Sequence, residues 1–430
     1  MGGITVNYEK LVALLKEQMR PALGVTEVGA IALACARARA LTEGAIQKIR
    51  VTLNKGMYKN AFSCSIPGTR EMGNEIAAAL GAVAGNWEKG LQALEGITKS
   101  QIEEAKHLVK EGVVEVEVNK KEDALYIRSE VITEHDTGIA VIKSTHDHIT
   151  LLEHNGEIIW QDQQERESQQ EEEFPFDSLT IEEMYHFVTT VETEKIAFLA
   201  DMVTMNLALA KEGAKGAGLK ISQSIKEYQK DGFLAQDMVS KAQELTCDAM
   251  DARLAGLPFP AMSITGSGSH GIVCSLPIVA YAKEKGCSDE ELHRALALSA
   301  LFTIYSKHYT GRLSPLCGCI LGGGTGACVG LVYLMGGKVQ EIGYAICHMA
   351  ANLTGMICDG GNWGCALKAA SGVQAAYLSA MLAMKGVEIP PYSGIVGATP
   401  EETVKHMGRI SLEGMRHTDE VLMDIMQNTK

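Results

Sequence analysis

The hydrophobic periodicity of the chain changes near residues 161–175, and this change limits what each half can form. Before it, residues 113–160 alternate apolar and polar side chains with a period of two, which is typical of half-buried strands. After it, residues 178–430 follow the helical period almost throughout. The run between them is polar and charged, and we interpret it as a solvated linker. The sequence therefore predicts an α+β fold: a small mixed α/β domain with antiparallel strands plus a large all-α C-terminal domain.

Three domains are predicted from these changes in pattern. Residues 1–44 predict N-terminal helices that pack on the core, with a break at Pro21 and Gly24. Residues 45–170 predict the α+β domain, in which Asn155-Gly156 between apolar runs is typical of a tight β-hairpin. Residues 178–430 predict an all-α domain, and most of the cysteines lie in it.

The balance of charge narrows the classes of partner. The chain has 430 residues with 53 acidic and 39 basic side chains, which gives a formal net charge of −14. A general binder of nucleic acid or of an anionic membrane needs a basic surface, so we expect neither partner. The N-terminal segment lacks the basic and apolar regions of a signal peptide, so we expect a cytoplasmic protein with reduced thiols.

An uncharged stretch from Leu316 to Gly337 is long enough to cross a bilayer. It is rich in glycine and cysteine, however, and a second uncharged run follows it closely. We therefore interpret the stretch as a buried central helix or helix pair, not as a membrane span.

A glycine-rich segment at 266–271 has the pattern G-x-G-x-x-G. A dinucleotide site would need a central strand before this pattern, and the preceding PFPA contains two prolines that disfavour one. Two interpretations remain open. The segment is either a nest of backbone amides that, with Ser267, Ser269 and His270, suits a small anion such as a carboxylate, or a purely structural turn.

Cysteines in glycine-rich turns are the strongest chemical signal in the chain. Cys317, Cys358 and Cys365 are separated by 41 and 7 positions, and Cys319 stands close to the first of them. Zinc sites usually contain paired C-x2-C steps, which this set lacks. The spacing leaves open a metal or cluster site and a set of buried core thiols. Three thiolates on a four-iron cluster would leave one iron open to act as a Lewis acid.

Several motifs along the chain together resemble one family. The chain resembles the iron–sulfur L-cysteine desulfidases in five places: LSPLCGC, the TGMICDG segment with its following CALK, the KNA segment, the IPGT segment and PALGVTE. That family is related to the α chain of bacterial iron–sulfur L-serine dehydratases. The resemblance implies that Cys317, Cys358 and Cys365 hold a [4Fe–4S] cluster in the helical domain. It also implies an α,β-elimination, in which L-cysteine loses sulfide and the resulting aminoacrylate hydrolyses to pyruvate and ammonia.

Three positions depart from the motifs of that family. Val25 stands where the family has a cysteine that is suspected of a catalytic role. Ser269 and His270 replace an Asn-Gln pair, and the family's H-T-N loop is here His146-Asp147-His148. Because histidine titrates near neutrality, these changes predict an altered acid–base arrangement.

The expected site combines these residues around a small amino-acid substrate. We expect Asn60, Thr69, Ser267, Gly268 and Ser269, with Lys59 beside them, to bind the substrate carboxylate. The candidates for the catalytic base are His270, His146 and Lys59, in that order. The alternatives are dehydration of L-serine, elimination on another β-substituted small acid, and a non-catalytic iron–sulfur or zinc redox sensor. We also expect a homo-oligomer.

Overall fold

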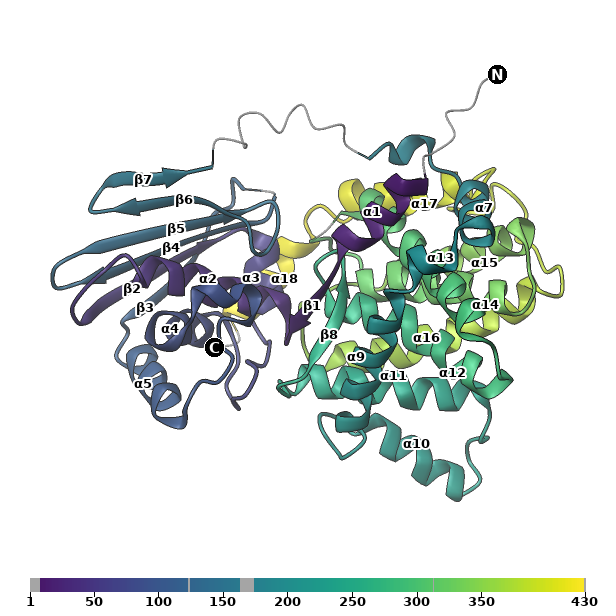
Figure 1. Ribbon diagram of the computed structural model, residues 1–430, viewed down its shortest axis with the longest axis horizontal. Helices are drawn as coiled ribbons and strands as arrows, with labels where there is room; N and C mark the ends of the chain where they lie inside the picture. Colours follow the sequence, from purple (N-terminus) through teal and green to yellow (C-terminus); the bar gives the residue numbers. More distant parts are fainter. Residues whose placement is uncertain (1–7, 123, 163–173, 312, 429–430) are drawn as a thin grey trace.

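The computed structural model describes the whole chain except residues 1–7, 123, 163–173, 312 and 429–430. The linker predicted at 161–175 therefore lies largely outside the described residues. The described chain forms two packed parts, one built around a sheet and one built from helices (Figure 1). The predicted α+β fold class is confirmed, with antiparallel strands and a helical C-terminal region.

A six-stranded sheet forms the centre of the first part. Its strand order is β3-β2-β4-β5-β6-β7, and only the β2–β3 pair is parallel. The strands are β2 (Ile46–Leu53), β3 (Val114–Val118), β4 (Tyr126–Thr133), β5 (Thr137–Lys143), β6 (Ile149–His154) and β7 (Glu157–Gln161). The predicted hairpin is confirmed, because Asn155 and Gly156 join β6 to β7 with φ values of +51° and +84°.

Small residues let two helices approach each other and the sheet closely. Helix α2 (Thr26–Arg39) packs on β4, β5 and α4 (Asn74–Ala84). A Cβ atom on Gly81 of α4 would lie 2.4 Å from the carbonyl oxygen of Ala32, and one on Gly138 of β5 would lie 2.2 Å from that of Ala38. Only glycine fits at these contacts. The remaining helices of this part are α3 (Lys55–Ala61), α5 (Lys99–Lys110) and the 3-10 turn η1 (Trp87–Gln92).

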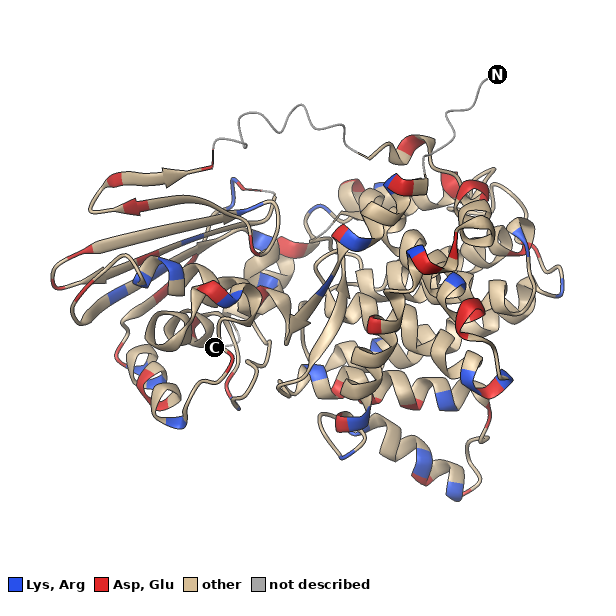
Figure 2. Ribbon diagram, viewed as in Figure 1, with Lys and Arg blue, Asp and Glu red and all other residues tan. Residues whose placement is uncertain are grey.

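The second part is a helical assembly with apolar helices at its centre. Its helices are α7 (Ile181–Thr190), α8 (Thr193–Ile196), α9 (Leu199–Gly213), α10 (Ile221–Lys230), α11 (Met238–Leu254), α12 (Gly268–Lys285), α13 (Asp289–Thr310), α14 (Thr325–Leu334), α15 (Val339–Leu353), α16 (Gly364–Ala383) and α17 (Pro400–Arg409), with short turns η2 (Phe176–Ser178) and η4 (Ile410–Gly414). Thr180, Asp237 and Ser288 begin helices with capping boxes. Acidic and basic residues are interspersed along both parts of the ribbon (Figure 2).

The uncharged stretch predicted as a central helix is buried in this assembly. It forms a π-helical turn, η3 (Cys319–Gly324), that leads directly into α14. Both segments contact α12, α13 and α16. Within the described ranges, no helix combines the length and the apolar character that crossing a membrane requires.

Segments from both ends of the chain join the two parts. Helix α1 (Tyr8–Gln18) packs on α13, and the C-terminal helix α18 (Thr418–Asn428) packs on α3. Strand β1 (Met19–Leu23) pairs antiparallel with β8 (Pro260–Ile264). The sequence did not predict this ribbon. Its prolines are tolerated because each strand of a two-stranded ribbon has one partner only, so a missing N–H can face outward. The domain boundaries proposed at 44, 170 and 178 stay a prediction.

Candidate functional site

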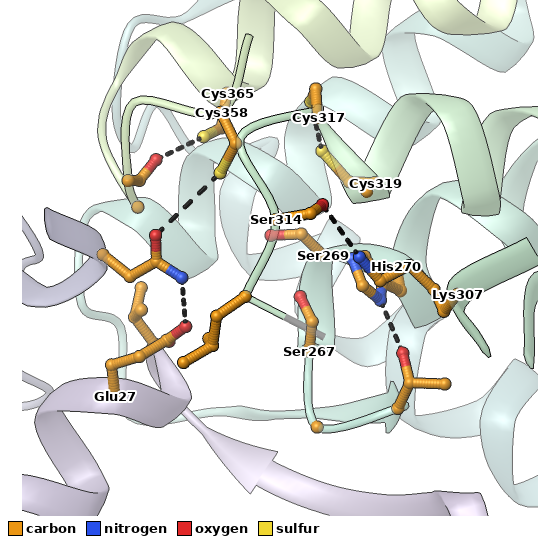
Figure 3. Close-up of a pocket in the computed structure, with 18 of the residues that line it drawn as sticks. Glu27, Ser267, Ser269, His270, Lys307, Ser314, Cys317, Cys319, Cys358 and Cys365 are labelled. Atoms are coloured by element: carbon orange, nitrogen blue, oxygen red, sulfur yellow. Dashed lines mark hydrogen bonds between the residues drawn. The ribbon is translucent and has the colours of Figure 1, made fainter. Parts of the chain in front are cut away.

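A pocket lies where the two parts meet, close to both ends of the β1–β8 ribbon. The sheet-containing part lines it with Val25, Glu27, Asn60 and His146. The helical part lines it with Arg253, Lys307 and residues of three segments, 265–270, 313–319 and 358–368. Figure 3 shows cysteines from two segments at one end of this pocket and Glu27 on the opposite wall.

The pocket brings together eight of the eleven residues that the sequence predicts for the site. These are Asn60, His146, Ser267, Ser269, His270, Cys317, Cys358 and Cys365. Lys59, Thr69 and Gly268 do not line it.

The three predicted cysteine ligands reach the pocket because two loops are tied together. Cys317 N donates to the carbonyl of Met356 at 2.9 Å, and Cys358 N donates to that of Pro315 at 2.7 Å. These bonds form a short antiparallel bridge between Leu316 and Ile357, in which Cys317 lies opposite Met356 and Cys358 lies opposite Pro315. Cys365 follows in the first turn of α16, and its thiol lies 3.3 Å from the carbonyl oxygen of Gly360. A fourth thiol, Cys319, lies 3.3 Å from the sulfur of Cys317.

Burial and nearby charges set the protonation of these thiols. The hydrogen bond from Cys319, aided by Lys368 and Lys307, lowers the pKa of Cys317 to about 7. Burial raises the pKa of Cys365 to about 12 and also raises that of Cys358. Most of the thiols in the pocket therefore stay protonated unless a metal or another cation compensates their charge.

A single metal ion and a cluster place different demands on the arrangement of their ligands. Among the described residues, no group of three or more His, Cys, Asp and Glu side chains converges on one ion position. In an iron–sulfur cluster each thiolate binds its own iron, so the ligands surround the centre instead of meeting at one point. Soft thiol ligands around a compact pocket are compatible in their chemistry with such a cluster.

His270 is held with one ring nitrogen toward the pocket. Its Nδ1 lies 2.9 Å from Thr265 Oγ1 and 3.2 Å from the carbonyl oxygen of Ile264. Burial and the charge of Lys307 lower the pKa of His270 to about 3, so the ring is neutral. Because Nδ1 faces a carbonyl, that nitrogen carries the proton and Nε2 is an unprotonated acceptor. A Cβ on Gly318 would stand 2.6 Å from Nε2, which shows how closely the cysteine loop passes.

The opposite wall carries a polar group of three residues. Asn60 Nδ2 donates to Glu27 Oε1 at 2.8 Å, and His146 Nε2 lies 3.9 Å from the same oxygen. Gly266 has a φ of +80° and a Cβ there would lie 2.9 Å from His146 Nδ1, so glycine is required on two counts. Asn60 Oδ1 also lies 4.0 Å from the sulfur of Cys358, so this polar group adjoins one of the cysteines.

Two of the predicted residues have other partners. Lys59 has a fully buried side chain, and its Nζ lies 2.7 Å from Asp419 Oδ1 of α18. Thr69 Oγ1 donates to the carbonyl of Ile66 and accepts from the backbone of Glu71 within a turn. Their roles in catalysis and substrate binding stay predictions.

Val25 contacts the loop that carries the cysteines. A Cβ on Gly361 would lie 3.0 Å from a methyl carbon of Val25 and 2.5 Å from the sulfur of Cys64. The Cys64 thiol, which is fully buried, donates to the carbonyl of Asn60 at 2.7 Å. Burial raises its pKa well above the usual range. A thiol thus stands beside Val25 in the fold, although the two positions are far apart in the sequence.

Sequence reasoning missed two buried cations in the pocket, Arg253 of α11 and Lys307 of α13. Each is only 3% exposed. Arg253 Nη1 donates to Ser269 Oγ at 3.1 Å, and Lys307 Nζ donates to Ser314 Oγ at 3.3 Å. Burial lowers the pKa of Lys307 to about 8. The available signal was a basic residue on a helix face that is otherwise apolar or small.

Comparisons with known proteins agree with the motifs. A family model described as "Serine dehydratase alpha chain" matches residues 88–424. A UPF0597 protein of Clostridium botulinum (strain Langeland) is 40% identical over 422 residues, covering 97% of this chain and 98% of the relative. UPF0597 proteins of Clostridioides difficile (strain 630) and Caldanaerobacter subterraneus are 40% and 37% identical, each over at least 96% of this chain and 97% of the relative.

Proposed function

Because the chain belongs to the serine dehydratase alpha chain family, we propose that it is a lyase for α,β-elimination on a small amino acid, with L-cysteine as the substrate and a [4Fe–4S] cluster as the cofactor. One observation carries the proposal. Cys317, Cys358 and Cys365 line the same pocket as the first turn of α12 and the acceptor nitrogen of His270. Cluster ligands, an anion-binding turn and a base are the parts that this elimination needs.

Cys317, Cys358 and Cys365 would hold the cluster. When bound, it would supply a Lewis acid for the leaving sulfur or hydroxyl group. Lys368 and Lys307 favour the thiolate form of Cys317, which is the form that binds iron. Cys319 is a further thiol within the pocket and supports the ligand set by its contact with Cys317.

The chain's own residues bind the substrate and move its proton. The first turn of α12, with Ser267 and Ser269, binds the carboxylate, because amide groups at a helix N-terminus favour anions. Asn60 faces the substrate from beside Cys358. His270 Nε2 accepts the Cα proton, the released electron pair forms the Cα–Cβ double bond, and sulfide leaves from Cβ. Water then converts the aminoacrylate to pyruvate and ammonia, so one L-cysteine and one water yield pyruvate, ammonia and hydrogen sulfide.

The runner-up function is dehydration of L-serine at the same site. The description of the matching family favours it. Both substrates carry the same carboxylate, Cα proton and β-leaving position, so the pocket distinguishes them only at sulfur or oxygen.

The test is elimination by anaerobically purified protein that has been reconstituted with iron and sulfide. Pyruvate is measured from L-cysteine and L-serine in parallel, for the natural protein, Cys358→Ala and Cys287→Ala. Cys287 lies outside the pocket and is the matched control. We expect faster pyruvate formation from L-cysteine, loss of iron and activity in Cys358→Ala, and neither loss in Cys287→Ala. Iron binding without pyruvate from either substrate would refute the proposal.

A further inference from the structure

The guanidinium of Arg253 is a buried charge that lacks a full set of partners. Its side chain lines the pocket, and Nη1 donates to Ser269 Oγ. Its Nε has no hydrogen-bond partner among the described residues. None of the described carboxylates lies within 4 Å of the guanidinium. A buried cation with a free donor is costly unless an anion completes its shell.

The other cations near the pocket have partners of their own. Lys368 pairs with Asp359, and Lys59 pairs with Asp419. Lys307 donates to the hydroxyl of Ser314. Lys307 and Arg253 thus both lack a carboxylate partner among the described residues, and of the two only Arg253 has a buried donor nitrogen, Nε, without a hydrogen bond.

The backbone of α12 is shaped to receive this guanidinium. A Cβ on Gly268 would lie 2.5 Å from Arg253 Nε and 3.1 Å from Nη2, so the guanidinium packs against the first residue of the helix. Ser267 is the N-cap residue of α12, and its side chain makes no capping hydrogen bond. Amide groups of a first helical turn lack intrahelical acceptors, and the helix dipole is positive there. Hydroxyl, amide and guanidinium donors thus meet at one corner of the pocket.

We propose that Arg253 binds the α-carboxylate of the substrate at the first turn of α12, together with Ser267 and Ser269. The identity of the ligand as an amino acid rests on the proposed function. A planar guanidinium matches a carboxylate in shape and charge and binds it through paired hydrogen bonds. Holding the carboxylate beside a positive charge also makes the Cα proton more acidic, because the charge stabilises the electron pair left on Cα.

The carboxylate of Glu27 and the nearby cysteines offer a competing role for Arg253. The charges of Glu27, Cys64, Cys365 and Cys319 favour its protonated form against the effect of burial, which lowers its pKa. If the arginine served only to balance the charge of Glu27 and of cysteines that bind iron, its loss would change iron binding and leave carboxylate recognition unchanged. The two roles therefore differ in a measurable way.

The test compares a carboxylate with its amide on reconstituted full-length protein. L-Alanine and L-alaninamide are used as binding probes in calorimetry, because neither has a β-leaving group. We expect the natural protein to prefer L-alanine by about a hundredfold or more. The affinities of Arg253→Gln for the two probes should lie within about threefold of each other. The preference of Arg253→Lys for L-alanine should be intermediate, because lysine keeps the charge without the planar guanidinium.

Two further variants protect the test against a folding defect. Gly268→Ala keeps the arginine but displaces its guanidinium, so it should also lose the preference. Arg409→Gln removes an exposed arginine that pairs with Glu413 and is the matched control, with the preference unchanged. Far-UV circular dichroism and iron content are measured for each variant. If Arg253→Gln and Gly268→Ala both keep the natural preference for L-alanine over L-alaninamide, with or without loss of iron, the proposal is overturned.

The outcomes separate this inference from the proposed function. Arginine-dependent binding of L-alanine in a protein that forms no pyruvate would leave the carboxylate site standing and refute the lyase. If instead the natural protein forms pyruvate and Arg253→Gln still prefers L-alanine to L-alaninamide, the lyase would stand and the carboxylate site at Arg253 would be refuted.

Discussion

The C-terminal helix supports one wall of the pocket through a buried charge pair, and Asp419→Asn tests this support. Lys59 Nζ lies 2.7 Å from Asp419 Oδ1, and the two side chains are 0% and 15% exposed. The substitution keeps the shape of the aspartate and removes its charge, so a buried ammonium group loses its carboxylate. Asn60 follows Lys59 directly and accepts a backbone hydrogen bond from Gly361 at 3.0 Å, which links α3 to the loop of Cys358.

The expected loss of stability follows from the burial of the pair. Removing one partner of a buried ion pair costs about 3–5 kcal/mol, and the partial exposure of Asp419 places this case near about 3 kcal/mol. For 430 residues with an unfolding entropy of about 2.1 cal/mol/K per residue, that loss lowers Tm by about 3 °C. Displacement of Asn60 should also slow pyruvate formation by about tenfold.

Thermal unfolding followed by far-UV circular dichroism measures the change in Tm. Glu420→Gln is the matched control, because Glu420 pairs with Lys55 on the same helices but is 45% exposed. We expect its Tm to stay within about 1 °C of the natural protein. The double variant Lys59→Met with Asp419→Leu should recover most of the lost stability, since it removes both charges. An unchanged Tm in Asp419→Asn, or an equal fall in Glu420→Gln, would refute the reasoning.

Three further predictions concern packing, pH and iron. Gly81→Ala should destabilise the fold by about 2 kcal/mol in chemical denaturation, because its Cβ meets the Ala32 carbonyl at 2.4 Å; a stability at or above that of the natural protein would contradict this. Burial lowers the pKa of His270 to about 3, whereas the pKa of a histidine in the unfolded chain is about 6.5. Because the unfolded chain then binds a proton that the folded protein does not, the folded protein loses stability as pH falls below about 6.5. The natural protein should therefore lose about 1 kcal/mol more than His270→Asn between pH 7 and 5.5 in denaturant titrations, and equal losses would contradict the buried neutral ring. Chelation of iron should abolish pyruvate formation without changing helix content, because the core of the helical part is apolar; activity that survives complete iron removal would exclude the cluster.

The sequence predicted those elements whose signal is local. The alternation along β4, with Ile127, Ser129, Val131 and Thr133 buried, follows directly from its period of two. The β1–β8 ribbon was missed because each strand is five residues long, contains proline and finds its partner about 240 positions away. Such a pairing depends on the folded context of both segments.

The site was predictable where spacing and chemistry coincide. Cys317, Cys358 and Cys365 stand out as thiols in glycine-rich loops, and all three line the pocket. Lys59 and Asn60 could not be distinguished from the sequence, because neighbouring residues on a helix point about 100° apart and only Asn60 lines the pocket. Arg253 was missed because an arginine reveals its role only once the fold shows that it is buried and incompletely paired.

The most direct test of the account is to measure sulfide and pyruvate in one anaerobic reaction of the reconstituted protein with L-cysteine. We expect the two products in equal amounts from the natural protein and neither product from Cys358→Ala. Natural protein that binds iron yet releases neither product, or Cys358→Ala that releases both at the natural rate, would contradict it.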